Sequence, residues 1–224
     1  VLRSISYTNG ISAALQTKNS EELRTLSLGT IVNNQQDAVE FLDISGKRVL
    51  SIYHQPDGGI EEYEFAKGGS TTFLDQAFVQ HALHQHEDKR GNKFSGYVNT
   101  ERGDYFFISG PVYDGEDQLV GVILVGTKMS TLVKTLREET LAQITLYDFQ
   151  GNILASTLST PSTLQEQEVK EVIQNHTQMS YIRSNTSRAV SVRDIGFREI
   201  LSAWKVRGDS TLGVIGVALG ESFL

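Results

Sequence analysis

Cysteine is absent from the 224 residues of this sequence. Its absence excludes disulfide bridges, thiolate metal ligands and cysteine nucleophiles, and it is compatible with either redox compartment. No apolar run approaches the roughly 18 residues that a membrane-spanning helix needs, and no segment has the pattern of a cleavable signal peptide. The chain begins at Val1 rather than Met, so we expect it to be cut from a longer protein.

Positive charge is also scarce. Lys and Arg together number 20 against 27 Asp and Glu, which gives a net charge of −7. Because a nucleic-acid surface needs clustered Lys and Arg, we expect no nucleic-acid partner. The 39% hydrophobic and 21% charged content is typical of a folded globular chain, and the length suffices for one large or two ordinary domains.

Motifs of catalysis and metal binding are missing. The sequence has neither a Gly-x-Ser-x-Gly elbow nor a His-Glu-x-x-His pair. His81 and His84 are three residues apart and lie on one helical face, whereas His86 is expected to point elsewhere. Zinc normally takes three or four ligands, so we expect no metal, no cofactor and no enzymatic activity. A secreted enzyme stays the less favoured alternative.

The first 36 residues carry apolar side chains at a loose helical spacing that Gly10 and Gly29 interrupt. This pattern predicts one long helix or two stacked helices. Two roles stay open for it: an amphipathic helix packed on its own domain, or a membrane-proximal stalk through which a homodimer forms.

Residues 105–125 contain an aromatic strand, the polar turn Asp114-Gly115-Glu116-Asp117 and a second apolar strand. A phosphate-binding loop is excluded because the residues after Gly121 form a β-branched apolar run that favours a buried strand. A calcium loop is excluded because no distal acidic ligand follows. The sequence therefore predicts an antiparallel hairpin here.

Two segments of the chain each have a similar counterpart further along the sequence. "AVEFLDISGKRVLSI" (38–52) resembles "ITLYDFQGNILAST" (144–157), so that Asp43 corresponds to Asp148 with an offset of 148 − 43 = 105. "LVGVILV" (119–125) resembles "TLGVIGV" (211–217), and Gly121 corresponds to Gly213 with an offset of 213 − 121 = 92. Two copies of one supersecondary unit are the simplest explanation.

Each copy starts with a hairpin, continues through a helical insert and ends with a long antiparallel hairpin. This order predicts an α+β fold, with an antiparallel sheet and helices on one side of it. We expect a helix over residues 1–36, a first module over 37–135 and a second over 136–224.

"YFFISGPVYDGEDQLVGVILVGTKMSTLV" followed by "ITLYDFQGNILAST" resembles the double Cache sensor domains, which are tandem PAS-like modules of bacterial receptors. The resemblance implies a long N-terminal helix, a membrane-distal module and a membrane-proximal module, each with a central antiparallel sheet flanked by helices. It also implies transmembrane helices before Val1 and after Leu224, an extracytoplasmic location, and a small ligand in the distal module. The cytoplasmic output would be that of a histidine kinase, a chemoreceptor or a cyclic-nucleotide signalling protein.

The amino-acid-binding members of that family have an Arg-x-Trp-Tyr cluster and an Asp just after the "GVxG" strand. Here Trp204 is the only tryptophan, and Gly126 stands at the position of the Asp. A buried α-amino group needs a carboxylate to replace its hydration. We therefore expect an organic acid or a similar small molecule rather than an amino acid.

If Gly126 occupies the position of the ligand-facing Asp, as the resemblance implies, strand alternation places Val122 and Leu124 on the same face. The partner strand adds Tyr105, Phe107 and Ser109, and the preceding loop adds Tyr97. Two further ligand-binding candidates, Tyr53 and Arg102, lie outside this pattern. The alternative is that these aromatic residues only fill a core between sheet and helices. In that case the chain is a structural dimerisation or relay module without a ligand of its own.

Overall fold

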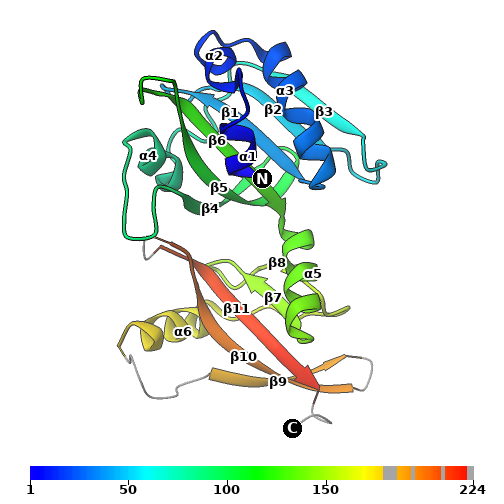
Figure 1. Ribbon diagram of the computed structural model, residues 1–224. Helices are drawn as coiled ribbons and strands as arrows, with labels where there is room; N and C mark the ends of the chain where they lie inside the picture. Colours follow the sequence, from blue (N-terminus) through cyan, green and yellow to red (C-terminus); the bar gives the residue numbers. More distant parts are fainter. Residues whose placement is uncertain (179–185, 193–194, 208–209, 221–224) are drawn as a thin grey trace. The chain divides into compact units, whose positions relative to one another are not determined.

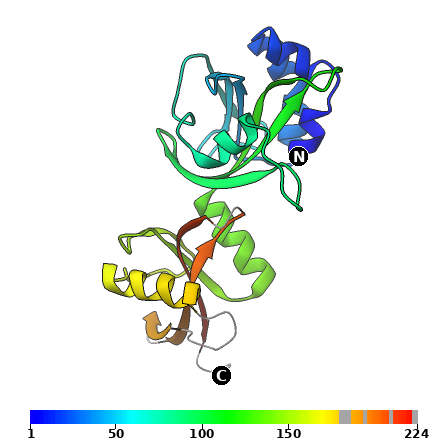
Figure 2. The same cartoon turned by 90° about the vertical axis from the view of Figure 1, so that its left-hand side faces the viewer.

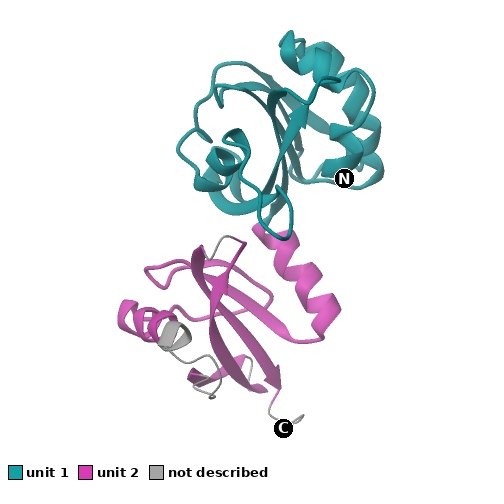
Figure 3. Cartoon of the chain, turned by 60° about the vertical axis from the view of Figure 1, so that its left-hand side comes forward, with its two compact units in different colours: residues 1–128 teal, residues 129–224 magenta. Residues whose placement is uncertain are grey.

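The computed structural model describes residues 1–178, 186–192, 195–207 and 210–220. The chain forms two compact units, residues 1–128 (unit 1) and 129–224 (unit 2), which Figure 3 shows in different colours. The boundary expected between residues 135 and 136 lies inside helix α5 (Met129–Thr140), the first element of unit 2. Within the described part of the chain, no helix is both long and apolar enough to cross a membrane.

Unit 1 is built on a six-stranded antiparallel sheet with the strand order β3-β2-β1-β6-β5-β4. Its strands are β1 (Ala38–Asp43), β2 (Arg48–His54), β3 (Tyr63–Lys67), β4 (Phe94–Thr100), β5 (Gly103–Tyr113) and β6 (Leu119–Lys128). The hairpin predicted from residues 105–125 is confirmed as β5–β6. Its turn is held by Asp114, whose Oδ1 accepts the backbone N–H groups of Glu116 and Gln118 at 2.9 Å each.

The N-terminal segment is helical as expected, but it forms three helices rather than one long helix or two stacked ones. These are α1 (Leu2–Ser6), α2 (Ile11–Gln16) and α3 (Ser20–Asn33). The breaks lie where the backbone is left-handed, at Gly10 (φ 92°) and Lys18 (φ 55°). Asn19 then caps α3 by accepting the N–H of Glu22.

The apolar side chains of these three helices pack on one face of the unit 1 sheet, in a core that includes Leu2, Ile5, Ile11, Leu15, Leu23, Ile31, Val39, Phe41, Leu50, Ile52, Ile123 and Val125. The helical segment is therefore packed on its own domain, which was the first of its two expected roles. Figure 1 and Figure 2 show α1 to α3 on one side of the sheet and helix α4 (Ala77–Leu83) on the other.

The expectation of helices on a single side is thus wrong for unit 1. All six residues of β1 are buried, so both faces of this central strand are covered. The second core includes Ala38, Leu42, Tyr53, Phe73, Phe78, Val79, Ala82, Phe94, Val98, Tyr105, Phe107, Val122 and Leu124. We call the face that carries this core the α4 face.

Unit 2 has a five-stranded antiparallel sheet with the order β8-β7-β11-β10-β9. Its strands are β7 (Gln143–Tyr147), β8 (Ile153–Ser156), β9 (Thr186–Val192), β10 (Ile195–Lys205) and β11 (Thr211–Gly220). Helix α5 contacts β7 and β8, and helix α6 (Glu166–Gln178) contacts β10 and β11. The core under α6 joins Leu164, Val169 and Val172 to Tyr147, Leu201 and Val214.

The repeat expected from the sequence is confirmed by matching turns. Asp148 Oδ1 accepts the N–H groups two and four residues further on, as Asp43 Oδ1 does in unit 1. Gly46 and Gly151 follow with φ of 75° and 84°. A Cβ on Gly121 or Gly213 would lie within 3.0 Å of the carbonyl oxygen of the residue just before each Asp. Only glycine lets these two strands approach so closely.

Candidate functional site

The strand register shows which predicted residues share the α4 face. Leu124 on β6 pairs with Ser109 on β5 and with Glu40 on β1, and Gly126 pairs with Phe107 and Ala38. Because residues two apart in a strand share a face, the α4 face unites seven of the nine predicted residues. They are Tyr53, Tyr105, Phe107, Ser109, Val122, Leu124 and Gly126.

Aromatic rings fill most of this face. The rings of Tyr53 and Tyr105 meet edge to face at 5.3 Å, and those of Phe73 and Phe107 do so at 5.1 Å. Tyr105 and Phe107 stack at 5.7 Å between centroids and so connect the two pairs. All four side chains are buried. The face is closed in this structure, with Phe73 lying over the sheet.

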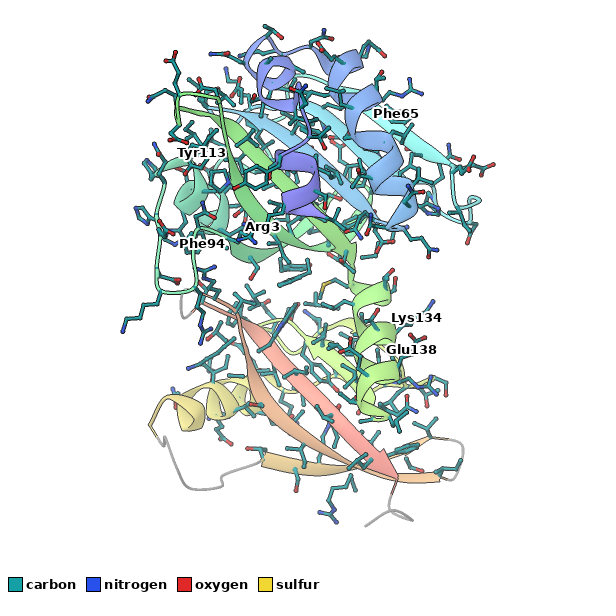
Figure 4. The ribbon with its side chains drawn as sticks, in the orientation of Figure 1. Arg3, Phe65, Phe94, Tyr113, Lys134 and Glu138 are labelled. Carbon is teal, nitrogen blue, oxygen red and sulfur yellow. The ribbon has the colours of Figure 1, made fainter. Side chains whose placement is uncertain are left out.

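Gly126 and Ser109 support this packing through their own contacts. A Cβ on Gly126 would lie within 3.0 Å of the Phe107 ring, so the glycine leaves the space that this ring occupies. The Ser109 hydroxyl donates to the carbonyl oxygens of Phe78, on α4, at 2.6 Å and of Phe94, on β4, at 3.3 Å. Figure 4 labels Phe94 beside α4. In this closed state Ser109 fastens α4 to the sheet.

The other two predicted residues do not lie on the strands of the α4 face with the same orientation. Tyr97, expected in a loop, is part of β4 and faces away from the α4 face, because it pairs with Phe106. Its hydroxyl donates to Asp104 at 2.5 Å. Arg102 lies in the turn between β4 and β5, where its Nε is 3.2 Å from a carboxylate oxygen of Glu64 and its guanidinium lies 4.8 Å from the centroid of the Tyr53 ring.

A buried carboxyl group, Glu40, completes the α4 face and was missed by the sequence reasoning. Its two oxygens accept hydrogen bonds from the hydroxyls of Ser51 and Tyr53, each at 2.6 Å, and the residue has no exposed surface. Burial raises the pKa of the Glu40 carboxyl to about 7 despite these two bonds. In unit 1, all of whose residues are described, no cationic nitrogen lies within 4.0 Å of it.

Glu40 faces a small cavity of about 30 Å³. The lining combines the face itself, residues of the segment 68–76 and the β4–β5 turn: Glu40, Arg48, Tyr53, Ser70, Thr72, Phe73, Thr100, Glu101 and Arg102. This volume holds about one water molecule. Two arginines, a buried carboxyl and several hydroxyls therefore converge at one corner of an otherwise apolar face.

A larger groove of about 860 Å³ lies between α1, the segment 87–93 and β5. Arg90 and Lys93 belong to the lining of this groove. None of its charged lining residues is buried. Because recognition needs groups removed from bulk water, the Glu40 cavity is the better candidate despite its smaller volume.

The histidine cluster differs from its expected geometry. The turn after α4, with Gln85 at a φ of 54°, returns His86 toward the helix, and the Nδ1 atoms of His81 and His86 are 2.9 Å apart. The expectation that His86 points elsewhere is therefore wrong. Among the described residues, no three His, Asp or Glu side chains are arranged to hold a metal ion.

Unit 2 also contains a buried carboxyl, but this one is paired with a cation. Glu199 has no exposed surface and accepts from Arg188 Nε at 2.6 Å and from the Tyr147 hydroxyl at 2.9 Å. The same guanidinium donates to the carbonyl oxygens of Ser162 and Thr163 at 2.9 and 3.0 Å. The ion pair thereby ties the segment before α6 to the sheet.

The chain thus consists of two α+β modules related by an internal repeat, and the first has a small cavity between its sheet, the segment 68–76 and the β4–β5 turn. Residues 1–219 match the family dCache_3, described as the double sensory domain of two-component sensor kinases. The chain belongs to this family, as the double Cache resemblance implied. It is an extracytoplasmic ligand-sensing domain of a signal-transduction receptor.

Solved structures share this fold at low sequence identity. The periplasmic sensory domain of the Campylobacter jejuni chemoreceptor Tlp1 has a TM-score of 0.52 at 13% identity, over 99% of this chain and 86% of that one. The ligand-binding domain of Pseudomonas fluorescens chemoreceptor CtaA, in complex with L-isoleucine, has 0.51 at 13%, over 99% and 82%. Methyl-accepting chemotaxis protein X has 0.60 at 11%, over 98% and 88%. A comparison with curated proteins gave no match.

Proposed function

We propose that unit 1 is the ligand-sensing module and that its ligand binds between the α4 face and the segment 68–76. The observation that carries this proposal is the cavity beside Glu40, where charged and hydroxyl groups converge next to the buried ring of Phe73. Perturbed carboxyl groups in such places are typical of functional sites. No covalent chemistry is needed, so the chain acts by binding rather than by catalysis.

Ligand entry requires the cover to move. Small-molecule pockets usually measure about 300–1,000 Å³, whereas the cavity here measures about 30 Å³. The segment 68–76 begins with Gly68 and Gly69, at φ of 65° and 77°, so its start is built for a change of backbone direction. Phe73 is the side chain that a ligand would displace. A ligand that prefers the opened conformation by a few kcal/mol would shift the population of the two states.

Arg48 and Arg102 support a carboxylate group on the ligand, such as the expected organic acid would carry. Both line the cavity, and a guanidinium binds a carboxylate through two parallel hydrogen bonds. In the closed state Arg48 Nε donates to the Gly68 carbonyl at 3.3 Å and Arg102 pairs with Glu64. A ligand carboxylate would compete for these groups and release the segment that starts at Gly68.

The experiment is a thermal-shift screen against organic acids, amines, amino acids, sugars and purines, followed by calorimetry and amide chemical-shift mapping. A ligand that binds only the folded state raises the melting temperature by mass action. We expect a hit whose shifts map to the α4 face, and whose binding is weakened by Phe107→Leu but unchanged by Tyr97→Phe on the opposite face. Shifts confined to unit 2, or equal binding by both variants, would refute the proposed site.

A structural relay without its own ligand is the second candidate, and the closed face favours it. The core residues of the α4 face are already buried by their own neighbours. If no compound in the screen stabilises the chain, and Phe73→Ala stays well folded without acquiring a ligand, unit 1 is such a relay.

The homodimer expected through the N-terminal helix is a separate proposal. Most apolar side chains of α1 to α3 are already buried in unit 1. A dimer would therefore use the outer side of α3, where Leu28 and Val32 are half-buried. Sedimentation of the chain and of a Val32→Glu variant tests it. A monomer in both cases would refute it.

A further inference from the structure

Each unit contains a buried carboxyl group, and the two groups differ in their hydrogen-bond donors. Glu199 in unit 2 is neutralised by Arg188 from the directly paired position of the neighbouring strand. Glu40 in unit 1 has Ser51 at its directly paired position, and its hydrogen-bond donors are the hydroxyls of Ser51 and Tyr53. A buried carboxylate without a cation is costly, since its charge is removed from water.

We propose that Glu40 is the ligand-recognition carboxylate of unit 1 and that it binds a protonated nitrogen of the ligand. This inference rests on the proposed sensory role of the α4 face and adds the chemical class of the ligand. An ammonium or guanidinium group takes, beside Glu40, the place that the Arg188 guanidinium has beside Glu199. Ser51 and Tyr53 keep the carboxylate oriented, because each hydroxyl fixes one of its oxygens.

The placement of Glu40 also changes an exclusion drawn from the sequence. An amino group was excluded because Gly126 stands where a ligand-facing Asp was expected. Glu40 lies on the same face, on the adjacent strand, and pairs with Leu124, two residues from Gly126. The α4 face therefore does hold a carboxyl group, supplied by β1 instead of β6.

The cavity lining carries two arginines and two glutamates, so its formal charge is balanced when both carboxyl groups are ionised. A protonated nitrogen of the ligand would pair with the Glu40 carboxylate, and a carboxylate of the ligand would pair with the guanidinium of Arg48 or Arg102. The required chemistry, a protonated nitrogen, can come from a simple amine or from a zwitterion that also carries a carboxylate. Matched probes separate these two sources.

The test uses three probes with similar carbon chains: butylamine, norvaline and butyrate. Binding to the wild-type chain is measured by calorimetry and amide chemical-shift mapping, and then repeated with Glu40→Gln. Glu101→Gln is the matched control, because Glu101 lines the same cavity but is exposed. Tyr53→Phe is a second variant, which keeps the carboxyl but removes one of its donors.

We expect butylamine or norvaline, but not butyrate, to bind at the α4 face. Glu40→Gln should weaken this binding by roughly 10- to 100-fold, as the loss of a hydrogen bond between charged groups does, and Glu101→Gln should leave it within about twofold. Tyr53→Phe should give a smaller loss. Binding by norvaline alone would identify a zwitterion as the ligand.

Two results would overturn the inference while leaving the sensory role of unit 1 intact: butyrate binding as well as norvaline does, or Glu40→Gln binding the nitrogen probes as tightly as the wild type. If none of the probes binds but the broader screen finds a nitrogen-free ligand on the α4 face, the inference is again wrong. If neither the probes nor the screen gives a ligand, both the inference and the proposed function fail.

Discussion

Replacing Arg188 by methionine should strongly destabilise unit 2. Methionine preserves much of the side-chain volume but removes the guanidinium that neutralises Glu199. The four hydrogen bonds of this group, to Glu199, Tyr147, Ser162 and Thr163, measure 2.6 to 3.0 Å. Breaking a buried pair from one side typically costs about 3–5 kcal/mol because it leaves an uncompensated buried charge. We expect a loss of that size in the free energy of unfolding.

Trp204 provides the assay. It is the only tryptophan of the chain and lies on β10, the strand that carries Glu199, so its fluorescence reports on unit 2. Urea denaturation of the wild type, Arg188→Met, Glu199→Gln and the double variant gives the coupling energy directly. The double variant should recover a large part of the loss, since it contains no buried charge.

Lys170→Met is the control for this cycle. Lys170 pairs with Glu166 one turn apart on α6, where both side chains are exposed, and such pairs contribute little. The reasoning would be refuted if Arg188→Met cost no more than Lys170→Met. It would also be refuted if the double variant were as unstable as Arg188→Met alone, because the cost would then come from lost packing instead of the unpaired charge.

Two further predictions concern the α4 face. Because burial raises the pKa of Glu40 from 4.5 to about 7 against Arg48, Arg102 and the donor hydroxyls, the folded state binds the proton more tightly than the unfolded state. The stabilisation by the protonated Glu40 side chain is fully present below the unfolded pKa and is lost as the pH rises through 7. The free energy of unfolding should therefore fall by about 3 kcal/mol between pH 4.5 and 7. Urea titrations of Glu40→Gln should show no such fall. Gly126→Ala should cost about 1–3 kcal/mol because its Cβ overlaps the Phe107 ring; a cost near zero would show that the ring can move aside.

Much of the fold could be predicted because its signals are local. The Asp turns, the apolar strands and the order of landmarks in the two copies all follow from short-range sequence patterns, and the structure reproduces them. The division of the N-terminal segment into three helices depends on the left-handed backbone of Lys18. Lysine does not favour this conformation, so the sequence did not predict the break. Helices on both faces of unit 1 could have been expected from β1, whose apolar residues do not alternate.

The candidate site was predicted only in part, for a related reason. Alternation grouped residues within a strand, such as Tyr105, Phe107 and Ser109, but it could not show that Tyr97 pairs with Phe106 and therefore faces away. Glu40 was missed although the sequence contained a signal for it. A glutamate inside the apolar segment "AVEFLD" must either be exposed or be buried with hydrogen-bonding or charged partners. Which of the two applies depends on the neighbours of β1, and a single strand does not reveal them.

The contrast between the units leads to one last prediction, a chemical rescue in unit 2. In the repeat, Glu199 takes the position of Phe107, since 199 − 92 = 107, so unit 2 replaces a ring by an internal ion pair. Arg188→Ala should leave a guanidinium-sized space that is partly open to solvent, since the Arg188 side chain is 20% exposed. Millimolar ethylguanidinium should then raise the melting temperature of this variant more than that of the wild type, because it binds only the folded state. The same compound should not stabilise the double variant with Glu199→Gln, and equal effects on all three chains would show that the carboxyl group does not select the cation. Selective stabilisation of Arg188→Ala would show that a buried carboxyl group in this fold can bind a free cation. The proposed binding of a protonated nitrogen by Glu40 depends on the same ability.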